Sequence, residues 1–269
     1  MRIAIQGQAG SFHEQAAKQW YGSDVTIVPC VTFGDVFQAY ARSKADAVVV
    51  AVENTIYGTI NETYRHIESC SAPIVGEVTL TIRQTLIANP GAQLEDITAV
   101  YSHSVALSQC QHFLQEHLPY AAQIEYFDTA GAVEFIKQQG SPHLAAVAGE
   151  TAAQLYNMPI LKHHIQDSQD NITRFLVLDQ TTTVADADRA TFVATTAHQP
   201  GSLLEILRTF ADQSINLTSL QSQPIVGQPW NYKFFMTVDA AGPSLHRAIN
   251  KITSTGHKIT LLGEYLAAR

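Results

Sequence analysis

The chain has few cysteines and no long apolar run. Its 269 residues include only three cysteines, Cys30, Cys70 and Cys110. Because these are odd in number and form no CxxC pair, the sequence argues against a disulfide framework and a zinc site. The longest strongly apolar run, residues 47–52, is far shorter than the roughly 20 residues that a membrane-spanning helix needs. We therefore expect no membrane partner.

Positive charge is also scarce. The chain has 16 Lys and Arg against 24 Asp and Glu, a formal net charge of −8 at pH 7. This balance argues against nucleic acid or an anionic membrane as the main partner, because neither finds a basic patch. A small anion is still compatible, since one or two Arg residues and backbone amides can hold it locally. The first residues lack the apolar core of a signal peptide, so we expect a cytoplasmic protein.

Predicted strands and helices alternate over the first two thirds of the chain. This alternation predicts an α/β fold with right-handed crossovers. The hydrophobic fraction of 46% is typical of a globular protein. Strands are predicted at 2–6, 25–29, 47–52, 79–88, 98–101, 122–127, 145–148 and 174–178, and helices at 12–20, 33–43, 104–117, 129–138 and 150–156.

A polar segment without periodicity, residues 181–188, predicts a domain boundary. We expect one domain over 1–180 and another over 189–269. The second should have the ferredoxin-like order βαββαβ. Its strands are predicted at 191–197, 217–223, 233–239 and 257–265, with helices at 201–213 and 244–255.

Polar motifs follow two of the buried strands. Gly7-x-x-Gly10-Ser11 precedes a helix, where backbone amides can face an anion at the positive end of the helix dipole. The alternative is a tight turn, and the spacing fits neither a P-loop nor GxGxxG. Glu53-Asn54-Thr55 follows the most buried strand, at the sheet edge where α/β proteins bind ligands. Its alternative is a solvated loop.

Further motifs carry hydroxyl and charged groups. Ser102-His103-Ser104 and Asp128-Thr129-Ala130 each join a strand to a helix, with a helix N-cap as the alternative. Asn171-x-Thr173-Arg174-Phe175 places a hydroxyl beside a cation, which suits a substrate with a carboxylate and a leaving hydroxyl. The alternative is an edge-strand Thr with a surface Arg. His163-His164 lacks further ligands at useful spacing, so we expect no metal.

Together, and in this order, the motifs resemble the prephenate dehydratase family. The residues that carry the resemblance are Gly7-x-x-Gly10-Ser11-Phe12, Val52-Glu53-Asn54-Thr55-x-x-Gly58, Tyr101-Ser102-His103, Gln109-Cys110, Thr129-Ala130 and Asn171-x-Thr173-Arg174-Phe175. The C-terminal part is similar to the ACT regulatory domain through Gly201-Ser202-Leu203-Leu204 and Ile215-Asn216-Leu217-Thr218. The resemblance covers the whole chain.

The resemblance implies a bilobed, periplasmic-binding-protein-like catalytic domain followed by the ACT domain. One lobe would span about 1–78 and 160–180, and the other about 79–159. It also implies a cofactor-free hydro-lyase of L-phenylalanine biosynthesis that converts prephenate to phenylpyruvate. Loss of carbon dioxide releases an electron pair, loss of hydroxide accepts it, and the ring becomes aromatic. The protein must hold a dianion and help hydroxide leave.

The resemblance implies a role for particular residues. Thr173 would hydrogen-bond the leaving hydroxyl, Arg174 would anchor a carboxylate, and the amides near Gly10 would take the other carboxylate. The implied catalytic set is Thr173, Arg174, Asn54, Ser102, Gln109 and Glu53, and the implied substrate-binding set is Gly10, Ser11, Thr55, Thr129 and Phe175. L-phenylalanine would be the effector, bound by Gly201, Ser202, Leu203, Leu204, Asn216, Leu217, Gln221, Ser222 and Gln223.

The chain departs from the family pattern at several positions. These are Ser104 and Val105 in place of Pro-Gln, Gln84 in place of His, Asp128 in place of Ser, and Gln221 and Gln223 in place of Glu and Arg. Two other functions stay open from the sequence, an arogenate dehydratase and a non-catalytic carboxylate-binding sensor. We expect a homodimer or homotetramer, because ACT domains commonly pair.

Overall fold

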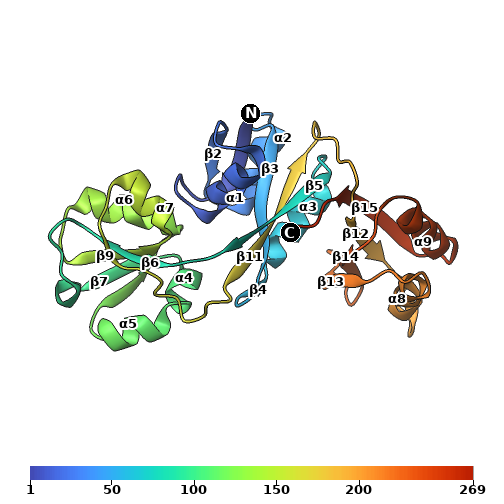
Figure 1. Cartoon of the computed structure of the whole chain (residues 1–269). Coiled ribbons are helices and arrows are strands. Elements are labelled where there is room, and N and C mark those ends of the chain that lie inside the picture. The colour runs from blue at the N-terminus through green and yellow to red at the C-terminus, as the bar shows by residue number, and fades with distance from the viewer. Residues whose placement is uncertain (269) are drawn as a thin grey trace. The chain divides into compact units, whose positions relative to one another are not determined.

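The computed structural model describes residues 1–268 and divides the chain into two compact units (Figure 1). The first unit consists of Met1–Thr63 and Val78–Phe175. The second consists of Tyr64–Glu77 and the chain from Leu176 onward. Among the described residues, no helix combines the length and apolar character needed to cross a membrane.

The first sheet has six strands in the order β2-β1-β3-β11-β5, with β4 paired to β3. The central strand β3 is parallel to β1 and is buried along nearly its whole length, as its apolar sequence predicts. Two of the strands, β5 and β11, run from one unit into the other. The strands are β1 (Arg2–Gln6), β2 (Thr26–Cys30), β3 (Ala47–Asn54), β4 (Gly58–Thr59), β5 (Ile74–Thr81) and β11 (Ile172–Asp179).

Three helices accompany this sheet, α1 (Phe12–Tyr21), α2 (Phe33–Ala41) and α3 (Asn61–Ser69). Side chains fix where two of them begin. Ser11 caps α1 by accepting a hydrogen bond from the backbone of Glu14. Thr32 and Asp35 form a capping box at the start of α2.

The second sheet has five strands in the order β10-β6-β9-β7-β8. Apolar side chains of β6, β7 and β9 pack against α4 and α5 on one face and against α6 and α7 on the other. The elements are β6 (Thr85–Ala88), η1 (Leu94–Asp96), β7 (Ala99–Ser102), α4 (Ser104–Ser108), α5 (Gln111–His117), β8 (Ala122–Glu125), α6 (Thr129–Gln139), β9 (Leu144–Ala148), α7 (Glu150–Tyr156) and β10 (Ile160–Lys162).

The third sheet is antiparallel, with the order β13-β14-β12-β15, and two helices share an apolar core with it. Its chain order is β12 (Arg189–Thr195), α8 (Ser202–Asp212), β13 (Leu217–Pro224), β14 (Tyr232–Val238), α9 (Gly242–Ser254) and β15 (Lys258–Tyr265). This order confirms the predicted βαββαβ arrangement. The two α/β sheets that precede the antiparallel sheet match the predicted mixed α/β class. Their number equals the number of lobes expected.

The local predictions were wrong at two places. The strand expected over 79–88 is two strands, β5 and β6, in different sheets. The segment between them crosses from one sheet to the other, and the backbone N–H of Ile82 bonds to the carbonyl of Asn171. The helix expected over 104–117 is interrupted at Gln109-Cys110, between α4 and α5. Helix α3 and strands β4 and β10 were not predicted.

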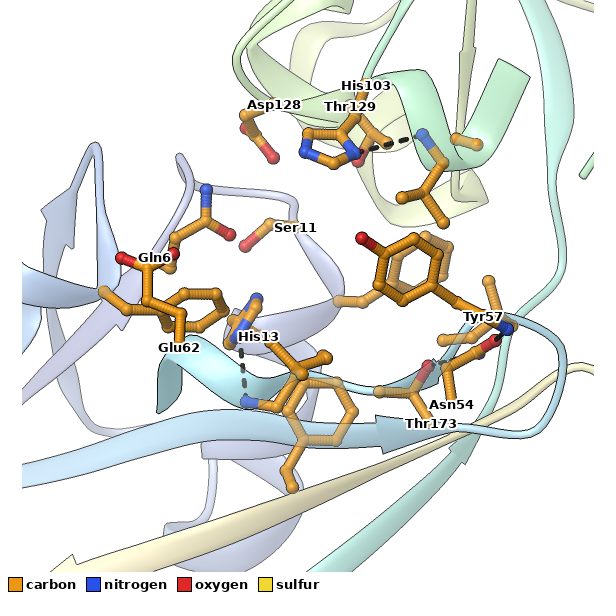
Figure 2. A pocket seen from close by; sticks show the side chains of 18 of the residues that line it. Gln6, Ser11, His13, Asn54, Tyr57, Glu62, His103, Asp128, Thr129 and Thr173 are labelled. Carbon is orange, nitrogen blue, oxygen red and sulfur yellow. Dashed lines mark hydrogen bonds between the residues drawn. The ribbon is translucent and has the colours of Figure 1, made fainter. Parts of the chain in front are cut away.

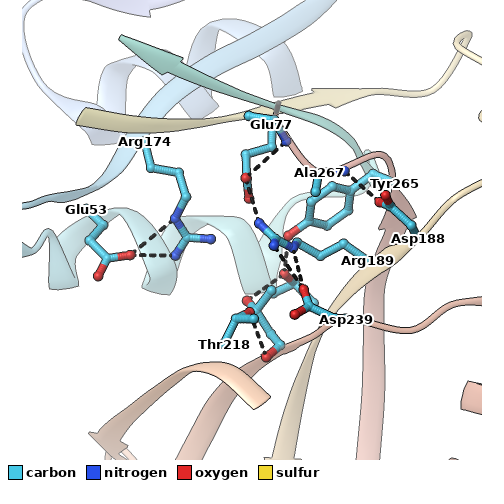
Figure 3. Close-up of polar contacts among 12 residues, drawn as sticks. Glu53, Glu77, Arg174, Asp188, Arg189, Thr218, Asp239, Tyr265 and Ala267 are labelled. Carbon is cyan, nitrogen blue, oxygen red and sulfur yellow. Dashed lines mark hydrogen bonds and ion pairs between the residues drawn. The ribbon is translucent and has the colours of Figure 1, made fainter. Parts of the chain in front are cut away.

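The segment 64–77 belongs with the C-terminal part of the chain. The Tyr64 and Phe235 rings lie 5.1 Å apart, and Arg189 forms an ion pair with Glu77 at 2.8 Å (Figure 3). After α7, the chain pairs with the second sheet through β10, which ends at Lys162. It then enters the first sheet as β11. The boundaries 1–180 and 189–269, and those of the two lobes, stay predictions.

Candidate active site

A cleft of about 610 Å³ lies within the first unit (Figure 2). Its polar lining consists of Gln6, Ser11, His13, Thr32, Asn54, Tyr57, Thr59, Asn61, Glu62, Gln84, His103, Gln109, Asp128, Thr129 and Thr173. Its apolar lining consists of Phe12, Val31, Phe33, Ala51, Ile60, Ile82, Val105, Ala106, Phe127 and Phe175. Side chains from both α/β sheets therefore meet at one place.

A buried hydrogen-bond network joins Asn54, at the end of β3, to three side chains far away in the sequence. Asn54 Nδ2 donates to Thr173 Oγ1 at 2.9 Å and to Asn171 Oδ1 at 2.7 Å. Asn171 Nδ2 in turn donates to Gln109 Oε1 at 2.9 Å. The interruption between α4 and α5 thus puts the Gln109 amide into this network.

The backbone fixes the orientation of the Asn54 amide. Its Oδ1 accepts from the backbone N–H groups of Ile56 at 3.0 Å and Tyr57 at 2.8 Å. Because a carbonyl oxygen must face those two donors, the NH₂ group must face Thr173. The Thr173 oxygen therefore acts as an acceptor toward Asn54, and none of the described contacts takes its own proton.

Two histidines line the cleft, and each accepts a hydrogen bond from the backbone (Figure 2). His13 Nε2 accepts from the N–H of Ala51 at 3.2 Å, and His103 Nδ1 accepts from that of Val105 at 3.3 Å. Burial, with a smaller contribution from the nearby His103, lowers the pKa of His13 to about 3. His13 is therefore neutral near pH 7 and carries its proton on Nδ1. The edge of its ring packs on Phe175, with centroids 5.1 Å apart.

Among the described residues, the cleft lining includes neither Lys nor Arg, and four helices begin at it. The helices α1, α2, α3 and α6, each of 9 to 11 residues, have first-turn residues in the lining. Each N-terminus carries an effective charge of roughly half a proton. The lining also holds two acids, Glu62 and Asp128. Each of these N-termini also carries an acid in its cap or first turn, Glu14 in α1, Asp35 in α2, Glu62 in α3 and Asp128 before α6, which offsets its dipole. An anionic ligand would therefore be held mainly by neutral donors.

Asp128 ties the glycine loop to α6. As N-cap, its Oδ2 accepts from the N–H groups of Gly131 at 2.9 Å and Gln8 at 3.0 Å. A Cβ on Gly7, whose φ is +96°, would lie 2.9 Å from Asp128 Oδ1, so only glycine fits there. Burial raises the pKa of the Asp128 carboxyl, and these backbone donors oppose the shift.

The glycine loop that was predicted to bind an anion has most of its amides already paired within the protein. The N–H of Gly10 donates to the Glu14 carboxylate, and that of Ser11 donates to the carbonyl of Gln8 at 3.2 Å. The N–H of Gln8 is taken by Asp128. Ser11 reaches the cleft through its side chain instead.

The structure brings about half of the predicted site residues together in the cleft, namely Asn54, Gln109, Thr173, Ser11, Thr129 and Phe175. Two others serve the fold. Ser102 is fully buried and donates from Oγ to the carbonyl of Val147 at 2.6 Å. Thr55 uses its hydroxyl to donate to the carbonyl of Asp170 and to accept from the N–H of Ile172. Neither lines the cleft.

Arg174 and Glu53 pair with each other outside the cleft lining (Figure 3). Arg174 Nη2 and Nε lie 2.8 Å and 3.2 Å from Glu53 Oε2. Successive strand residues point to opposite faces of a sheet, so the neighbours of Asn54 and Thr173 face away from the cleft. The carboxylate-anchoring role predicted for Arg174 therefore has no support in this arrangement.

The sequence analysis did not assign His13, Phe33, Tyr57 and Glu62 to the site. A usable signal existed for His13 and Phe33, because each lies in the first turn of a helix that follows a strand of the first sheet. The described residues contain no cluster of three or more His, Cys, Asp or Glu side chains that could hold a metal ion.

The residues predicted to bind an effector lie in the second unit, and they differ in environment. Gly201 precedes α8 with a φ of +91°, which favours glycine. Asn216 donates to Asp239 at 3.1 Å, while Leu203 and Leu217 pack on the apolar core. Leu204 is 55% exposed.

Comparison with known proteins identifies relatives over nearly the whole chain. The family model described as "Prephenate dehydratase" matches residues 3–183. The bifunctional chorismate mutase/prephenate dehydratase of Aquifex aeolicus is 33% identical, over 98% of this chain and 73% of that protein. The chloroplastic arogenate dehydratase/prephenate dehydratase 2 of Arabidopsis thaliana is also 33% identical, over 98% of this chain and 72% of its own length.

Two solved structures that resemble this chain carry different descriptions. The prephenate dehydratase of Arthrobacter aurescens, in complex with L-Phe, is similar with a TM-score of 0.88 and 28% identity, over 100% of this chain and 90% of that one. A protein described as GqqA, a novel type of quorum quenching acylase, is similar with a TM-score of 0.89 and 28% identity, over 100% of this chain and 98% of that one.

Proposed function

The chain belongs to the prephenate dehydratase family, and from that premise we propose that it converts prephenate to phenylpyruvate, water and carbon dioxide. The observation that carries the proposal is the Thr173 hydroxyl, which accepts from Asn54 and so has its proton free for a group in the cleft. A leaving hydroxyl is the group of prephenate that needs such a donor.

The reaction breaks two bonds of the substrate and needs no oxidant. The bond from the ring to the departing carboxylate breaks, and its electron pair moves through the diene. The opposite carbon–oxygen bond breaks, and hydroxide leaves and becomes water on taking up a proton. Because an unperturbed Thr is a very weak acid, Thr173 stabilises the leaving oxygen by a hydrogen bond rather than by releasing a free proton.

The lack of a cationic side chain in the cleft suits this reaction. The departing carboxylate loses its negative charge as carbon dioxide forms. An ion pair to that carboxylate would stabilise the ground state more than the transition state and would slow the reaction. Neutral donors hold the dianion without that penalty.

An acyl-transfer reaction has less support in this cleft. Such chemistry needs a nucleophile activated by a neighbouring base. Ser11 Oγ accepts from the backbone of Glu14, and the two cleft imidazoles bond to backbone N–H groups of Ala51 and Val105. None of the described contacts joins a cleft histidine to Ser11.

The test is phenylpyruvate formation from prephenate by the purified protein and by Thr173→Val. We expect the variant to lose roughly 10² to 10³ in kcat, as when one transition-state donor is removed. Thr26→Val, at an exposed position of β2, is the matched control and should keep full activity. Full activity of Thr173→Val would refute the mechanism.

The second candidate is arogenate dehydratase activity. Arogenate carries an ammonium group where prephenate has a keto group, and the acids Glu62 and Asp128 in a lining without Lys or Arg favour such a group. Offering each substrate to the wild-type protein separates the two. Binding of either without turnover would indicate the carboxylate-binding sensor instead.

We also propose that residues 189–269 form a regulatory ACT domain that binds L-phenylalanine at the effector set named from the sequence. The βαββαβ order and the L-Phe complex of the Arthrobacter relative support this. Kinetics with added L-phenylalanine test the control, and variants at Gln221 and Gln223 test the site. Light scattering tests the predicted homodimer or homotetramer, which a monomer would contradict. The cytoplasmic location stays a prediction.

A further inference from the structure

Gln84 lies where the chain crosses from β5 to β6, and its backbone is held on both sides. Its N–H donates to the Gln166 side chain at 2.9 Å, and its carbonyl accepts from the N–H of Ile165 at 2.9 Å. The two segments that cross between the sheets therefore fix each other at this residue. The direction of the Gln84 side chain is set by paired backbone rather than by a free loop.

The side-chain amide of Gln84 has no hydrogen-bond partner among the described residues, although the residue is only 2% exposed. Its Oε1 is buried and unpaired, and the side chain lines the cleft. Leaving a buried polar group without a partner costs free energy, so such groups are rare in folded proteins.

The other amides of the cleft do have partners. Asn54 and Gln109 belong to one hydrogen-bond network, in which Gln109 donates to Asn54 and Asn54 donates to the carbonyl of Ile172. Gln6 donates to the carbonyl of Val31, and Asn61 also has an interaction partner. Gln84 is thus the amide of the lining that the described residues leave unsatisfied. Because its side chain lines the cleft, a bound ligand can satisfy it.

The charge of the lining indicates what kind of ligand atom that would be. The lining contains two acids and neither Lys nor Arg. A ligand with two carboxylates must therefore take its hydrogen bonds from neutral donors, and the NH₂ group of a Gln amide is one. The atom left unpaired is the acceptor Oε1, and a half-turn about the last torsion of the side chain puts the NH₂ donor in its place without moving the backbone.

We propose that Gln84 is a substrate-binding residue whose side-chain amide donates a hydrogen bond to an oxygen of the bound substrate. This inference rests on the proposed function for the identity of the substrate. Gln84 stands at a position where the family pattern led us to expect His, so it sets how this chain holds its substrate. Its unpaired state without ligand is the cost of that role.

The test is steady-state kinetics with prephenate on Gln84→Met and Gln84→Glu. Methionine has nearly the same shape but no amide, so KM should rise roughly tenfold or more while kcat stays within about twofold. Glutamate removes the donor and adds a like charge, so its KM should rise further. The control is Gln138→Met, at an exposed position of α6, which should leave both constants unchanged.

Thermal melting without ligand separates binding from a structural role. Because Gln84→Met removes an unpaired buried amide, its Tm should equal or exceed that of the wild type. A Tm that falls together with activity would show that the amide supports the fold, and would overturn the inference. So would an unchanged KM in Gln84→Met. If the wild type turns over neither prephenate nor arogenate, the proposed function itself fails, whatever Gln84 does.

Discussion

Replacing Asn54 by Asp tests the hydrogen-bond network of the cleft most directly. The NH₂ group of Asn54 serves Thr173, Asn171 and the carbonyl of Ile172, at 2.9, 2.7 and 3.2 Å. An ionised carboxylate has no proton to donate to any of them. Thr173 would then turn and donate its own proton to the new carboxylate, so that the substrate loses it.

The expected loss follows from those contacts. Two hydrogen bonds at about 1 kcal/mol each, with one acceptor left unpaired, give a destabilisation of roughly 3 kcal/mol in Asn54→Asp. Withdrawal of the Thr173 proton from the leaving group should lower kcat by roughly 10² at pH 8. The variant should still fold, because domains usually have about 5 to 15 kcal/mol of stability.

The pH dependence of Asn54→Asp gives the prediction its sharpest test. Burial raises the pKa of the introduced carboxyl, and the backbone N–H groups of Ile56 and Tyr57 oppose this shift. Below that pKa the neutral carboxyl has an O–H that can donate to Thr173 again, and the ratio of variant to wild-type kcat should rise as pH falls from 8 to 5. The uncatalysed reaction of prephenate must be subtracted at each pH. Asn250→Asp, on the exposed face of α9, is the control.

Two results would refute this reasoning. A kcat of Asn54→Asp close to that of the wild type at pH 8 would mean that Thr173 does not need the hydrogen bond that the Asn54 amide donates to it. A ratio that stays flat between pH 8 and 5 would mean that the loss comes from a distorted cleft and not from a missing proton. Urea unfolding of the variant at both pH values checks that the fold is intact.

Three further predictions concern stability and binding. The pKa of His13 is lowered from its ordinary 6.5 to about 3, so the contribution of the neutral imidazole to stability is complete above pH 6.5 and is lost as pH falls toward 3. The urea midpoint of His13→Gln should therefore fall less between pH 7 and 5 than that of the wild type. Arg174→Met should keep the KM for prephenate and lose about 1 kcal/mol of stability in urea unfolding, because Arg174 pairs with Glu53 outside the cleft lining; a large rise in KM would contradict this. Asp128→Ala should lower the free energy of unfolding by roughly 1 to 2 kcal/mol, because α6 loses its N-cap; an unchanged Tm would count against that role.

Local sequence patterns predicted most elements because each pattern matched the burial of its element. The run 47–52 is apolar at every position, and β3 is buried on both faces. The errors fall where distant contacts decide the structure. Nothing in residues 79–88 indicates a sheet crossing, since the crossing depends on Asn171 and Ile165. Helix α3 is polar on average, and its Tyr64 is buried through packing that includes Phe235.

The order of the motifs identified Asn54, Gln109 and Thr173 as site residues. It also placed Glu53 and Arg174, their neighbours in the sequence, in the same site. The period of two along a strand excludes that, because Asn54 and Glu53 cannot face the same side. The same argument separates Thr173 from Arg174. The strand period can be read from the sequence, whereas the burial of Ser102 cannot, because its partner Val147 lies 45 residues further along.

The cleft offers neutral hydrogen-bond donors to the ligand, and its described lining places no cationic side chain beside the carboxylate that leaves. Neutral donors can hold a dianion without forming an ion pair with either carboxylate. His13 stays neutral because burial keeps its pKa low, so it adds an N–H donor and no positive charge. Gln84 adds a neutral donor of the same kind in our proposal. A substrate that must lose a carboxylate and a hydroxide is thereby positioned by contacts that do not oppose either departure, and introducing a cation, as in Gln84→Lys, should tighten binding while lowering kcat.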